Sequence, residues 1–275
     1  MKKLNIGITG STGVLGKKLI LLNKKKYKFI KFTGDITSKK DVFNWMQRKN
    51  FDCLFHFAAL VPTFKVEKNY KYALRVNYNG TKNIVDAFNH FKQKSIMWFF
   101  FSSTSHVYAY SKKKIKENSN LLGSSLYGKT KIKSEKYILN NLRPNINYCI
   151  GRIFSFTDTN QPESFFVPKY KKLMFKKNYI KVDNLNQYRD FIHIDDLIKC
   201  IFFLMKKNYR GIINIASGKK IRLNKMIQII AKNYNKKVFF NKNKDFSAKS
   251  LIADVTKLKK LGFKNKFDIH KIINL

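Results

Sequence analysis

Three equally spaced glycines near the start of the chain restrict its fold more than any other part of the sequence. Gly10, Gly13 and Gly16 lie between a β-branched run at 3–9 and an amphipathic helix pattern at 14–23. Glycines at such a junction let the backbone turn tightly and approach a pyrophosphate, whose charge then lies at the helix N-terminus. An unliganded strand-to-helix turn is the alternative interpretation. The spacing predicts that a phosphate-binding turn follows the first strand.

Strand and helix patterns alternate as far as residue 154. The predicted strands cover 3–9, 29–32, 52–57, 96–102 and 147–154, and the predicted helices cover 14–23, 39–48, 77–91 and 126–140. Such alternation predicts an α/β fold in which a doubly wound parallel sheet is covered on both faces. Beyond Thr157 the alternation loosens. We therefore expect a nucleotide-binding portion at 1–156 and a smaller C-terminal lobe mainly at 157–275, with segments that return to the first portion.

The composition is strongly basic, with 57 Lys plus Arg against 16 Asp plus Glu among 275 residues and a formal net charge of +41. Such a balance invites a nucleic-acid interpretation, but only seven of these residues are Arg, the residue that bidentate recognition of phosphate or guanine favours. Lys, Asn, Ile, Phe and Tyr, all encoded by A/T-rich codons, make up 146 of the residues. We interpret the excess charge as a solvated surface that helps to attract an anionic substrate, without a specific nucleic-acid partner.

The apolar runs and the cysteines indicate where the protein works. The longest apolar runs, 96–101 and 200–205, fall short of the roughly 18 residues that a membrane span needs. The N-terminus lacks the hydrophobic region of a secretory signal. Cys53, Cys149 and Cys200 are odd in number and far apart, which disfavours a disulfide framework or a zinc site. We expect a cytoplasmic protein with no membrane span and no metal.

Tyr127 and Lys131 are four residues apart on a predicted helix, so that their side chains share one face. An ammonium beside a phenol favours the phenolate and lowers its pKa, which makes the tyrosine a usable general acid or base. A surface pair is the alternative in a chain with so many lysines. The hydroxyl-rich segment 102–108 follows an apolar run and is expected at the carboxyl end of a strand, where open α/β sheets bind ligands.

These motifs together resemble the extended short-chain dehydrogenase/reductases, specifically the NAD-dependent epimerase/dehydratase group that acts on nucleotide sugars. The resemblance covers nearly the whole chain and implies a Rossmann-like fold with a substrate-binding lobe. The segments that carry it are, in chain order, Thr9-Gly10-x-x-Gly13-x-x-Gly16, Gly34-Asp35-Ile36, His56-Phe57-Ala58-Ala59 (at the end of the family's fourth strand), Asn77-x-x-Gly80-Thr81, Ser102 to Tyr108, Tyr127-x-x-x-Lys131, Arg189 to Asp196, Asn214 to Gly218 and Ala253-Asp254.

The resemblance implies roles for individual residues. Tyr127 would exchange a proton with a sugar oxygen during hydride transfer, Lys131 would hold the nicotinamide ribose, and Thr104 would hydrogen-bond the same sugar oxygen. The implied cofactor contacts are Gly10, Ser11, Thr12, Gly13, Val14, Leu15, Gly16, Asp35, Ile36, Phe57, Ala58, Ala59, Asn77, Tyr127 and Lys131. The implied substrate contacts are Thr104, Ser105, Ser155, Arg189 and Lys244, with Arg189 and Lys244 as the positive groups near the substrate diphosphate.

The departures from the family pattern narrow the reaction. The dehydratases of the group have an Asp-Glu pair where this chain has Ser105 and His106, so that dehydration is disfavoured. His106 is a further catalytic candidate, and a packed or solvent-facing histidine is its alternative. His56 is interpreted as a satisfied buried histidine, and Asp195 and Asp196 as a helix cap and a structural bond.

The expected activity is therefore NAD(P)-dependent epimerisation or 4-keto reduction of a nucleotide sugar at one carbon, most naturally C4. The cofactor is NAD or NADP, because no acidic residue or Arg marks the usual ribose position. The partners are a nucleoside-diphosphate sugar and, as the family implies, a second copy in a homodimer. The alternative is a non-catalytic protein on the same fold that senses a dinucleotide or binds polyanions.

Overall fold

The computed structural model describes residues 3–61, 63–91, 96–183, 185, 187–241 and 249–273. The chain forms two compact units. The first contains Met1–Ala109, Asn120–Arg152 and Ile201–Ile213, and the second contains Tyr110–Ser119, Ile153–Cys200 and Asn214–Leu275. The chain passes between the units first at 109–110 and again at 152–153. The expected boundary at residue 156, with later segments that return to the first portion, stays a prediction.

A six-stranded sheet forms the centre of the first unit, in the order β10-β5-β4-β3-β1-β2. Its strands are β1 (Asn5–Thr9), β2 (Lys28–Lys31), β3 (Cys53–His56), β4 (Trp98–Thr104), β5 (Asn147–Ile153) and β10 (Gly211–Ile215). β1 pairs in parallel with both β2 and β3, and β3 pairs in parallel with β4. The strand order reverses between β1 and β3, which is the switch point where doubly wound sheets bind ligands. The expected Rossmann-like α/β fold is confirmed.

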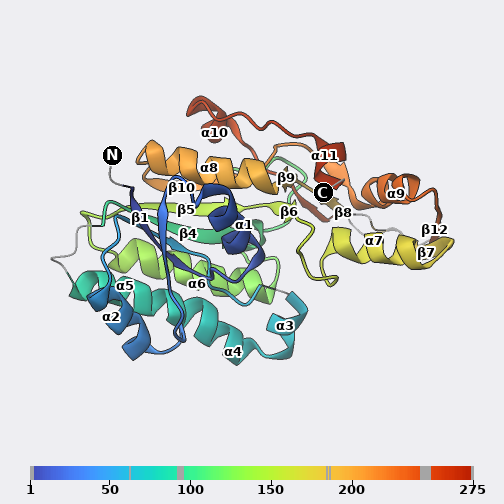
Figure 1. Ribbon diagram of the computed structural model, residues 1–275. Coiled ribbons are helices and arrows are strands. Elements are labelled where there is room, and N and C mark those ends of the chain that lie inside the picture. Colours follow the sequence, from blue (N-terminus) through green and yellow to red (C-terminus); the bar gives the residue numbers. More distant parts are fainter. Residues whose placement is uncertain are drawn as a thin grey trace. The chain divides into compact units, whose positions relative to one another are not determined.

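The helices of the first unit lie on both faces of this sheet (Figure 1). They are α1 (Val14–Asn23), α2 (Lys39–Arg48), α3 (Thr63–Lys68), α4 (Tyr70–Leu74), the π-helix η1 (Arg75–Asn79), α5 (Gly80–His90), the 3₁₀-helix η2 (Ser105–Val107), α6 (Leu126–Asn141) and the end of α8 (Ile194–Lys206). α2, α5 and α6 cover one face, and α1 covers the other (Figure 1).

β4 shows why the sequence places this sheet at the centre. Its first four residues, Trp98 to Phe101, are apolar and at most 1% exposed. Phe99 and Phe101 point into the cluster that contains α5 residues, and the Phe99 and Phe88 rings form an edge-to-face contact with 5.2 Å between their centroids. Phe100 packs against Phe55 at 6.1 Å, and Phe55 in turn contacts Phe202 of α8. A strand buried on both faces requires this continuous apolar run.

The segment between β3 and α5 differs from the prediction. A helix was predicted at 77–91, but α3, α4 and η1 already occupy Thr63–Asn79, and η1 runs into α5 without a break. The resemblance placed the His-x-Ala-Ala segment at the end of the family's fourth strand. Here it follows the third strand of the chain, since β1 and β2 are the strands that precede β3. The remaining predicted strands and helices of this unit agree with the structure to within two residues at each end.

The described residues of the second unit form short strands and four further helices. Its strands are β6 (Ser155–Thr157), β7 (Tyr179–Asp183), β8 (Gln187–Arg189), β9 (Phe191–His193), β11 (Ile221–Arg222), β12 (Lys237–Asn241) and β13 (Lys249–Leu251). Its helices are α7 (Phe166–Lys176), α9 (Leu223–Asn233), α10 (Thr256–Lys260) and α11 (Ile269–Ile273), besides the first part of α8. β7 pairs with β12, and an apolar cluster from α7, α9 and α11 packs against this pair.

Two negative findings hold for the described part of the chain. None of its helices is both long and apolar enough to span a membrane. Its His, Cys, Asp and Glu side chains form no group of three or more that could hold a metal ion.

Replacement of Phe99 by Ala tests the packing of the sheet. The variant creates a cavity at a site that is fully buried, so that we expect it to lower the free energy of unfolding by about 3–5 kcal/mol. Met97→Ala is the control, because Met97 is 48% exposed and its loss should change stability by less than about 0.5 kcal/mol. Urea unfolding measures both variants, and equal values for the two would contradict the described packing.

Candidate active site

The turn after β1 is shaped by two glycines that the protein's own backbone requires. Gly10 has a φ of +69°, and a Cβ there would lie 2.6 Å from the backbone of Phe57 and Ala58. A Cβ on Gly16 would lie 2.3 Å from the Gly10 carbonyl oxygen. Gly10 thus allows the turn to touch the end of β3, and Gly16 allows α1 to pack onto the turn.

Gly13 has a different reason to be glycine. A Cβ there would meet only the Gly10 oxygen, at an ordinary 3.4 Å, and its φ of −73° suits any residue. Gly13 is the exposed N-cap of α1, and no side chain caps this helix. The bare backbone and the helix N-terminus therefore fit a pyrophosphate, which needs close approach and N–H donors. Thr12 and Gly13 are exposed in this turn, Val14 is half-buried, and Ser11, Leu15 and Gly16 are buried.

The other expected cofactor contacts are distributed around the same switch point. Phe57, Ala58 and Ala59 are half-buried after β3, and Phe57 N donates to the Thr9 carbonyl at 3.2 Å. Asp35 is exposed after β2, where hydrogen bonds from Thr37 lower the pKa of its carboxyl.

Ile36 is 8% exposed and belongs to the apolar core, where Gly80 makes room for it. Its side chain thus packs inside the protein.

A chain of buried side-chain hydrogen bonds begins directly before the glycine turn. Thr9 Oγ1 lies 2.6 Å from His56 Nδ1, His56 Nε2 lies 3.1 Å from Thr81 Oγ1, and Thr81 Oγ1 donates to the Asn77 carbonyl at 2.7 Å. Because Thr81 uses its single proton on that carbonyl, it accepts from His56 Nε2–H, and Nδ1 accepts from Thr9. Burial and the nearby Lys131 lower the pKa of His56 to about 3, so that the ring is neutral. The interpretation of His56 as a satisfied buried histidine is confirmed.

Asn77 continues this chain toward α6. It is 0% exposed; its Oδ1 accepts from Leu60 N at 2.7 Å, and its Nδ2 donates to the Leu60 carbonyl and to Thr130 Oγ1. Both amide donors are therefore used inside the protein. Asn77 thus links η1 to α6, and its expected contact with the cofactor stays a prediction.

The candidate catalytic side chains come from β4, η2 and α6. Thr104, the last residue of β4, accepts a hydrogen bond from His106 N at 3.3 Å. The His106 ring lies against the Tyr127 ring of α6, with 6.2 Å between the centroids. One turn further along α6, the Lys131 ammonium lies over the Phe101 ring of β4 at 4.5 Å. The predicted group of Thr104, Tyr127 and Lys131 thus gathers around the carboxyl end of β4.

Close contact between α6 and η2 produces this arrangement. A Cβ on Gly128 would lie 1.9 Å from the His106 carbonyl oxygen, so that only glycine allows the first turn of α6 to come so near. Ser125 caps α6 by accepting from Gly128 N at 3.1 Å, and its Oγ also lies 3.2 Å from His106 Nδ1. Gly128 was not predicted as a site residue, although a glycine inside a helix pattern is a signal for close packing.

His106 is accordingly tied into the N-terminus of α6. Its carbonyl accepts from Ser124 N and Ser124 Oγ, and its side chain contacts Ser125 and Tyr127. His106 is half-buried, which is compatible with a packing role and with the candidate proton-transfer role, so that both stay predictions. Ser105 is 4% exposed in the same short helix.

The electrostatics of the pair differ from the prediction. Tyr127 is 8% exposed, and burial raises the pKa of its phenol above the ordinary value of 10.0. Burial also lowers the pKa of Lys131 to about 7, although the Glu135 carboxylate acts in the opposite direction. The expected lowered pKa of Tyr127 is therefore wrong for this structure, because desolvation of the buried phenol raises its pKa.

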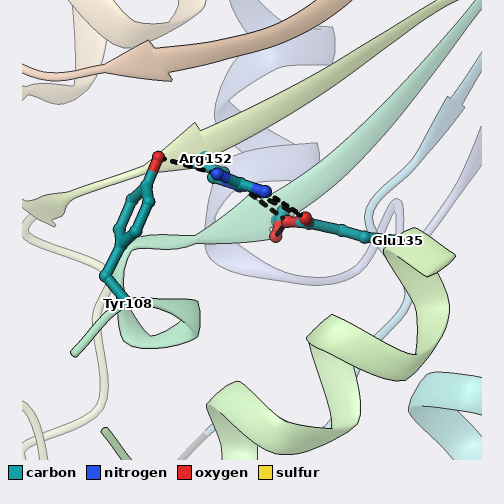
Figure 2. A network of polar contacts seen from close by, with 4 residues as sticks. Tyr108, Glu135 and Arg152 are labelled. Carbon is teal, nitrogen blue, oxygen red and sulfur yellow. Dashed lines mark hydrogen bonds and ion pairs between the residues drawn. The ribbon is translucent and has the colours of Figure 1, made fainter. Parts of the chain in front are cut away.

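One turn beyond Lys131 on α6, Glu135 takes part in a buried ion pair. Arg152 of β5 binds Glu135 of α6 with Nη2 at 2.6 Å from Oε2, and its Nη1 donates to the Tyr108 hydroxyl at 2.9 Å (Figure 2). Ser103 of β4 also donates to Glu135. Sequence reasoning missed Glu135 and Arg152, since nothing in their spacing signals that the two would meet.

The expected substrate contacts Arg189 and Ser155 belong to the second unit. The Arg189 guanidinium donates to the carbonyls of Tyr188 and Lys249 and to Gln187 Oε1, and burial lowers its pKa. Ser155 is half-buried in β6, and its N–H donates to the Asp190 carbonyl. Lys244, the other expected substrate contact, lies outside the described residues.

Asp190 explains why several motifs of the second unit occur together. Its carboxylate is 0% exposed and accepts hydrogen bonds from Ser217 N, Ser217 Oγ and Gly218 N and, at 3.3 Å, from Ala253 N. Burial raises its pKa to about 6 against the lowering effect of these bonds.

Asp196 accepts from Lys266 N and Phe267 N, which confirms the structural bond expected there. Asp195 lies in the first turn of α8 without being its cap.

The fold and the site together are those of a Rossmann-like protein, a class that binds dinucleotides at the switch point of the sheet. The model of the NAD dependent epimerase/dehydratase family matches residues 6–216. The chain belongs to this family, which confirms the expected extended short-chain dehydrogenase/reductase, its enzymatic nature and an NAD or NADP cofactor. At the level that the family supports, it is a nucleotide-sugar epimerase, dehydratase or reductase.

Similar proteins fit this assignment. The chain is 29% identical to a GDP-6-deoxy-D-talose 4-dehydrogenase of Aggregatibacter actinomycetemcomitans over 78% of this chain and 75% of that protein. It is 26% identical to a dTDP-4-dehydro-6-deoxyglucose reductase of Escherichia coli over 96% and 93%. The structure of RMD from Pseudomonas aeruginosa complexed with NADPH has the same fold, with a TM-score of 0.86, 16% identity and coverage of 98% and 96%.

Alanine at Gly13 and at Gly16 should separate cofactor binding from folding. Gly13→Ala meets no protein atom closer than 3.4 Å; we expect it to cost less than about 1 kcal/mol of stability, the scale of a cap change. It should weaken dinucleotide binding by about tenfold, or ~1.4 kcal/mol. Gly16→Ala collides with the turn and should cost about 1–3 kcal/mol of unfolding free energy. Calorimetric titration and urea unfolding measure the two effects; unchanged binding by Gly13→Ala would exclude this turn as the phosphate contact.

Proposed function

We propose that the protein transfers hydride between a nicotinamide dinucleotide and C4 of a nucleoside-diphosphate sugar, either in net reduction of a 4-keto group or in 4-epimerisation. The convergence of Thr104, Tyr127 and Lys131 at the carboxyl end of β4 carries the proposal. The two relatives described above support C4, since both of their names specify a reaction at position 4.

The residues would divide the chemistry as follows. The turn at Gly10 to Gly16 would hold the dinucleotide, whose nicotinamide supplies or accepts the hydride. Tyr127 would donate a proton to the C4 oxygen as the ketone is reduced and would remove it in the reverse direction. Thr104 would orient that oxygen by a hydrogen bond.

Lys131 would hold the nicotinamide ribose. Tyr127 and Lys131 are 8% and 1% exposed, so that the proton transfer would proceed away from bulk water.

The absence of an Asp-Glu pair at Ser105 and His106 supports hydride transfer without loss of water. Arg189, Ser155 and Lys244 remain the candidate contacts for the sugar nucleotide. The three free cysteines, all buried, support a reducing, cytoplasmic setting. The homodimer stays a prediction that light scattering of the purified protein tests.

Consumption of reduced cofactor distinguishes the two reactions. Purified protein is mixed with NADPH or NADH and candidate 4-keto nucleotide sugars, and absorbance of the reduced cofactor is followed. Stoichiometric oxidation indicates a reductase, whereas conversion of a nucleotide sugar to its 4-epimer without net oxidation of cofactor indicates an epimerase. Failure of both reactions with a dinucleotide-bound protein over a broad set of nucleotide sugars would refute the proposal.

Tyr127→Phe tests the proposed proton transfer. The variant keeps the ring that packs against His106 and loses only the hydroxyl, so that dinucleotide affinity should be nearly unchanged. We expect kcat to fall by about 10²- to 10⁴-fold, the usual contribution of general acid-base catalysis. Tyr70→Phe, a neighbouring residue in the same apolar cluster, is the matched control and should retain activity. Substantial activity in Tyr127→Phe would show that Tyr127 is structural.

A further inference from the structure

The Arg152 guanidinium joins three segments of the first unit. It is 1% exposed, and its Nε and Nη2 atoms donate to both oxygens of Glu135 at 2.6 to 3.2 Å. Figure 2 shows Tyr108 and Glu135 reaching the guanidinium from opposite sides. Glu135 belongs to α6, Arg152 to β5, and Tyr108 follows η2 directly. The ion pair therefore connects the helix that carries Tyr127 and Lys131 with the segment that carries Thr104 and His106.

The position of Glu135 on α6 makes this pair more than a structural link. Tyr127, Lys131 and Glu135 are spaced four residues apart, so that all three lie along one face of the helix. Lys131 is 1% exposed, with its ammonium over the ring of Phe101. A buried ammonium needs a nearby negative charge to remain protonated.

Four titratable groups are linked to Lys131 by helix spacing, by electrostatics or through Glu135. Tyr127 and Glu135 lie on its own helix, His56 lies on β3 and is electrostatically coupled to it, and Arg152 lies on β5 behind Glu135. His56 is neutral, Tyr127 is protonated and Arg152 is positive. Glu135 is thus the group in this set that supplies negative charge.

We propose that Glu135, held in place by Arg152 and Ser103, is a positioning residue that keeps the buried Lys131 protonated and in place beside Tyr127. The naming of Lys131 as a catalytic group rests on the proposed function, whereas the electrostatic dependence of Lys131 on Glu135 does not. Burial already brings the pKa of Lys131 down to about 7, with Glu135 opposing the fall. Loss of the carboxylate would therefore leave Lys131 largely neutral at pH 7.

The pH dependence of unfolding measures this effect without substrate or cofactor. Below pH 7, Lys131 carries its proton in both the folded and the unfolded protein. Between about 7 and 10.5, only the unfolded protein holds it. The unfolded state then binds more protons, so that stability rises with pH across this window. The difference in unfolding free energy between wild type and Lys131→Met isolates this rise, since the contributions of the other titratable groups are the same in both proteins. The pH at which the rise begins, its lower limit, marks the pKa of Lys131 in the folded state.

The same difference is then measured in a Glu135→Gln background, with Glu135→Gln and Glu135→Gln/Lys131→Met as the pair. We expect the lower limit of the rise to move down by about one pH unit or more, the usual effect of a close opposite charge. Tyr108→Phe is the matched control, because it removes one buried hydrogen bond to Arg152 and leaves Glu135 in place. Its lower limit should stay at the wild-type pH. An unmoved limit in the Glu135→Gln pair overturns the proposal.

Glu135→Gln alone leaves a buried guanidinium without its partner and can fail to fold. The double variant Glu135→Gln/Arg152→Met removes both charges and provides the same comparison, again with and without Lys131→Met. In this background too, a lower limit that stays at wild type overturns the proposal.

The activity of the folded variants provides the second readout. Glu135→Gln should move the alkaline limb of the pH profile of kcat, where Lys131 loses its proton, in the same direction as the unfolding limit, and Glu135→Asp should restore part of the shift. If Lys131 has no part in catalysis, the unfolding limits still move while the kcat profile does not. That result refutes the proposed function and leaves the electrostatic role of Glu135 standing.

Discussion

The position of α6 depends on buried polar contacts, and the candidate active site depends on the position of α6. Asn77 bonds to Thr130, Ser134 bonds back to the Asn77 carbonyl, and Glu135 pairs with Arg152. Apolar packing alone tolerates small shifts, whereas each of these contacts is lost when the helix slides or rotates. Polar groups buried without partners are costly, so that these bonds select one arrangement of the helix against the sheet.

The same burial that fixes the site removes much of its charge. His56 is neutral, the pKa of Tyr127 is raised, and that of Lys131 lies near 7. In such surroundings a single ionised side chain has a large effect, because little water screens it. The ion pair of Glu135 and Arg152 is overall neutral, yet its two ends act on different neighbours. Its negative end belongs to α6 and acts on Lys131, and its positive end contacts Tyr108.

Most of the sheet could be predicted because local signals coincide there with the final fold. The glycine turn and the apolar runs gave β1, α1 and β4 to within two residues, and the spacing of Tyr127 and Lys131 brought both side chains to one helix face. α3, α4 and η1 were missed, because the segment before Asn77 is polar and shows no clear period. The partners of Asn77 and Glu135 were missed for another reason: they come from elements that only the folded chain brings together, so that no spacing reveals them.

The large number of lysines in the chain and the presence of a lysine at position 131 need different explanations. We interpret the excess of lysines as an effect of codon usage at solvated positions, where each additional ammonium costs little. It does not account for Lys131, which is 1% exposed and the sole lysine among the buried polar residues of the described chain. Burial of an ammonium costs desolvation free energy, so that a buried lysine lowers the stability of the protein unless neighbouring groups compensate. An arginine at this position would stay charged regardless of its surroundings, whereas the charge of a lysine responds to a neighbouring carboxylate. The burial of Lys131, rather than its abundance as a residue type, therefore distinguishes it from the other 49 lysines of the chain.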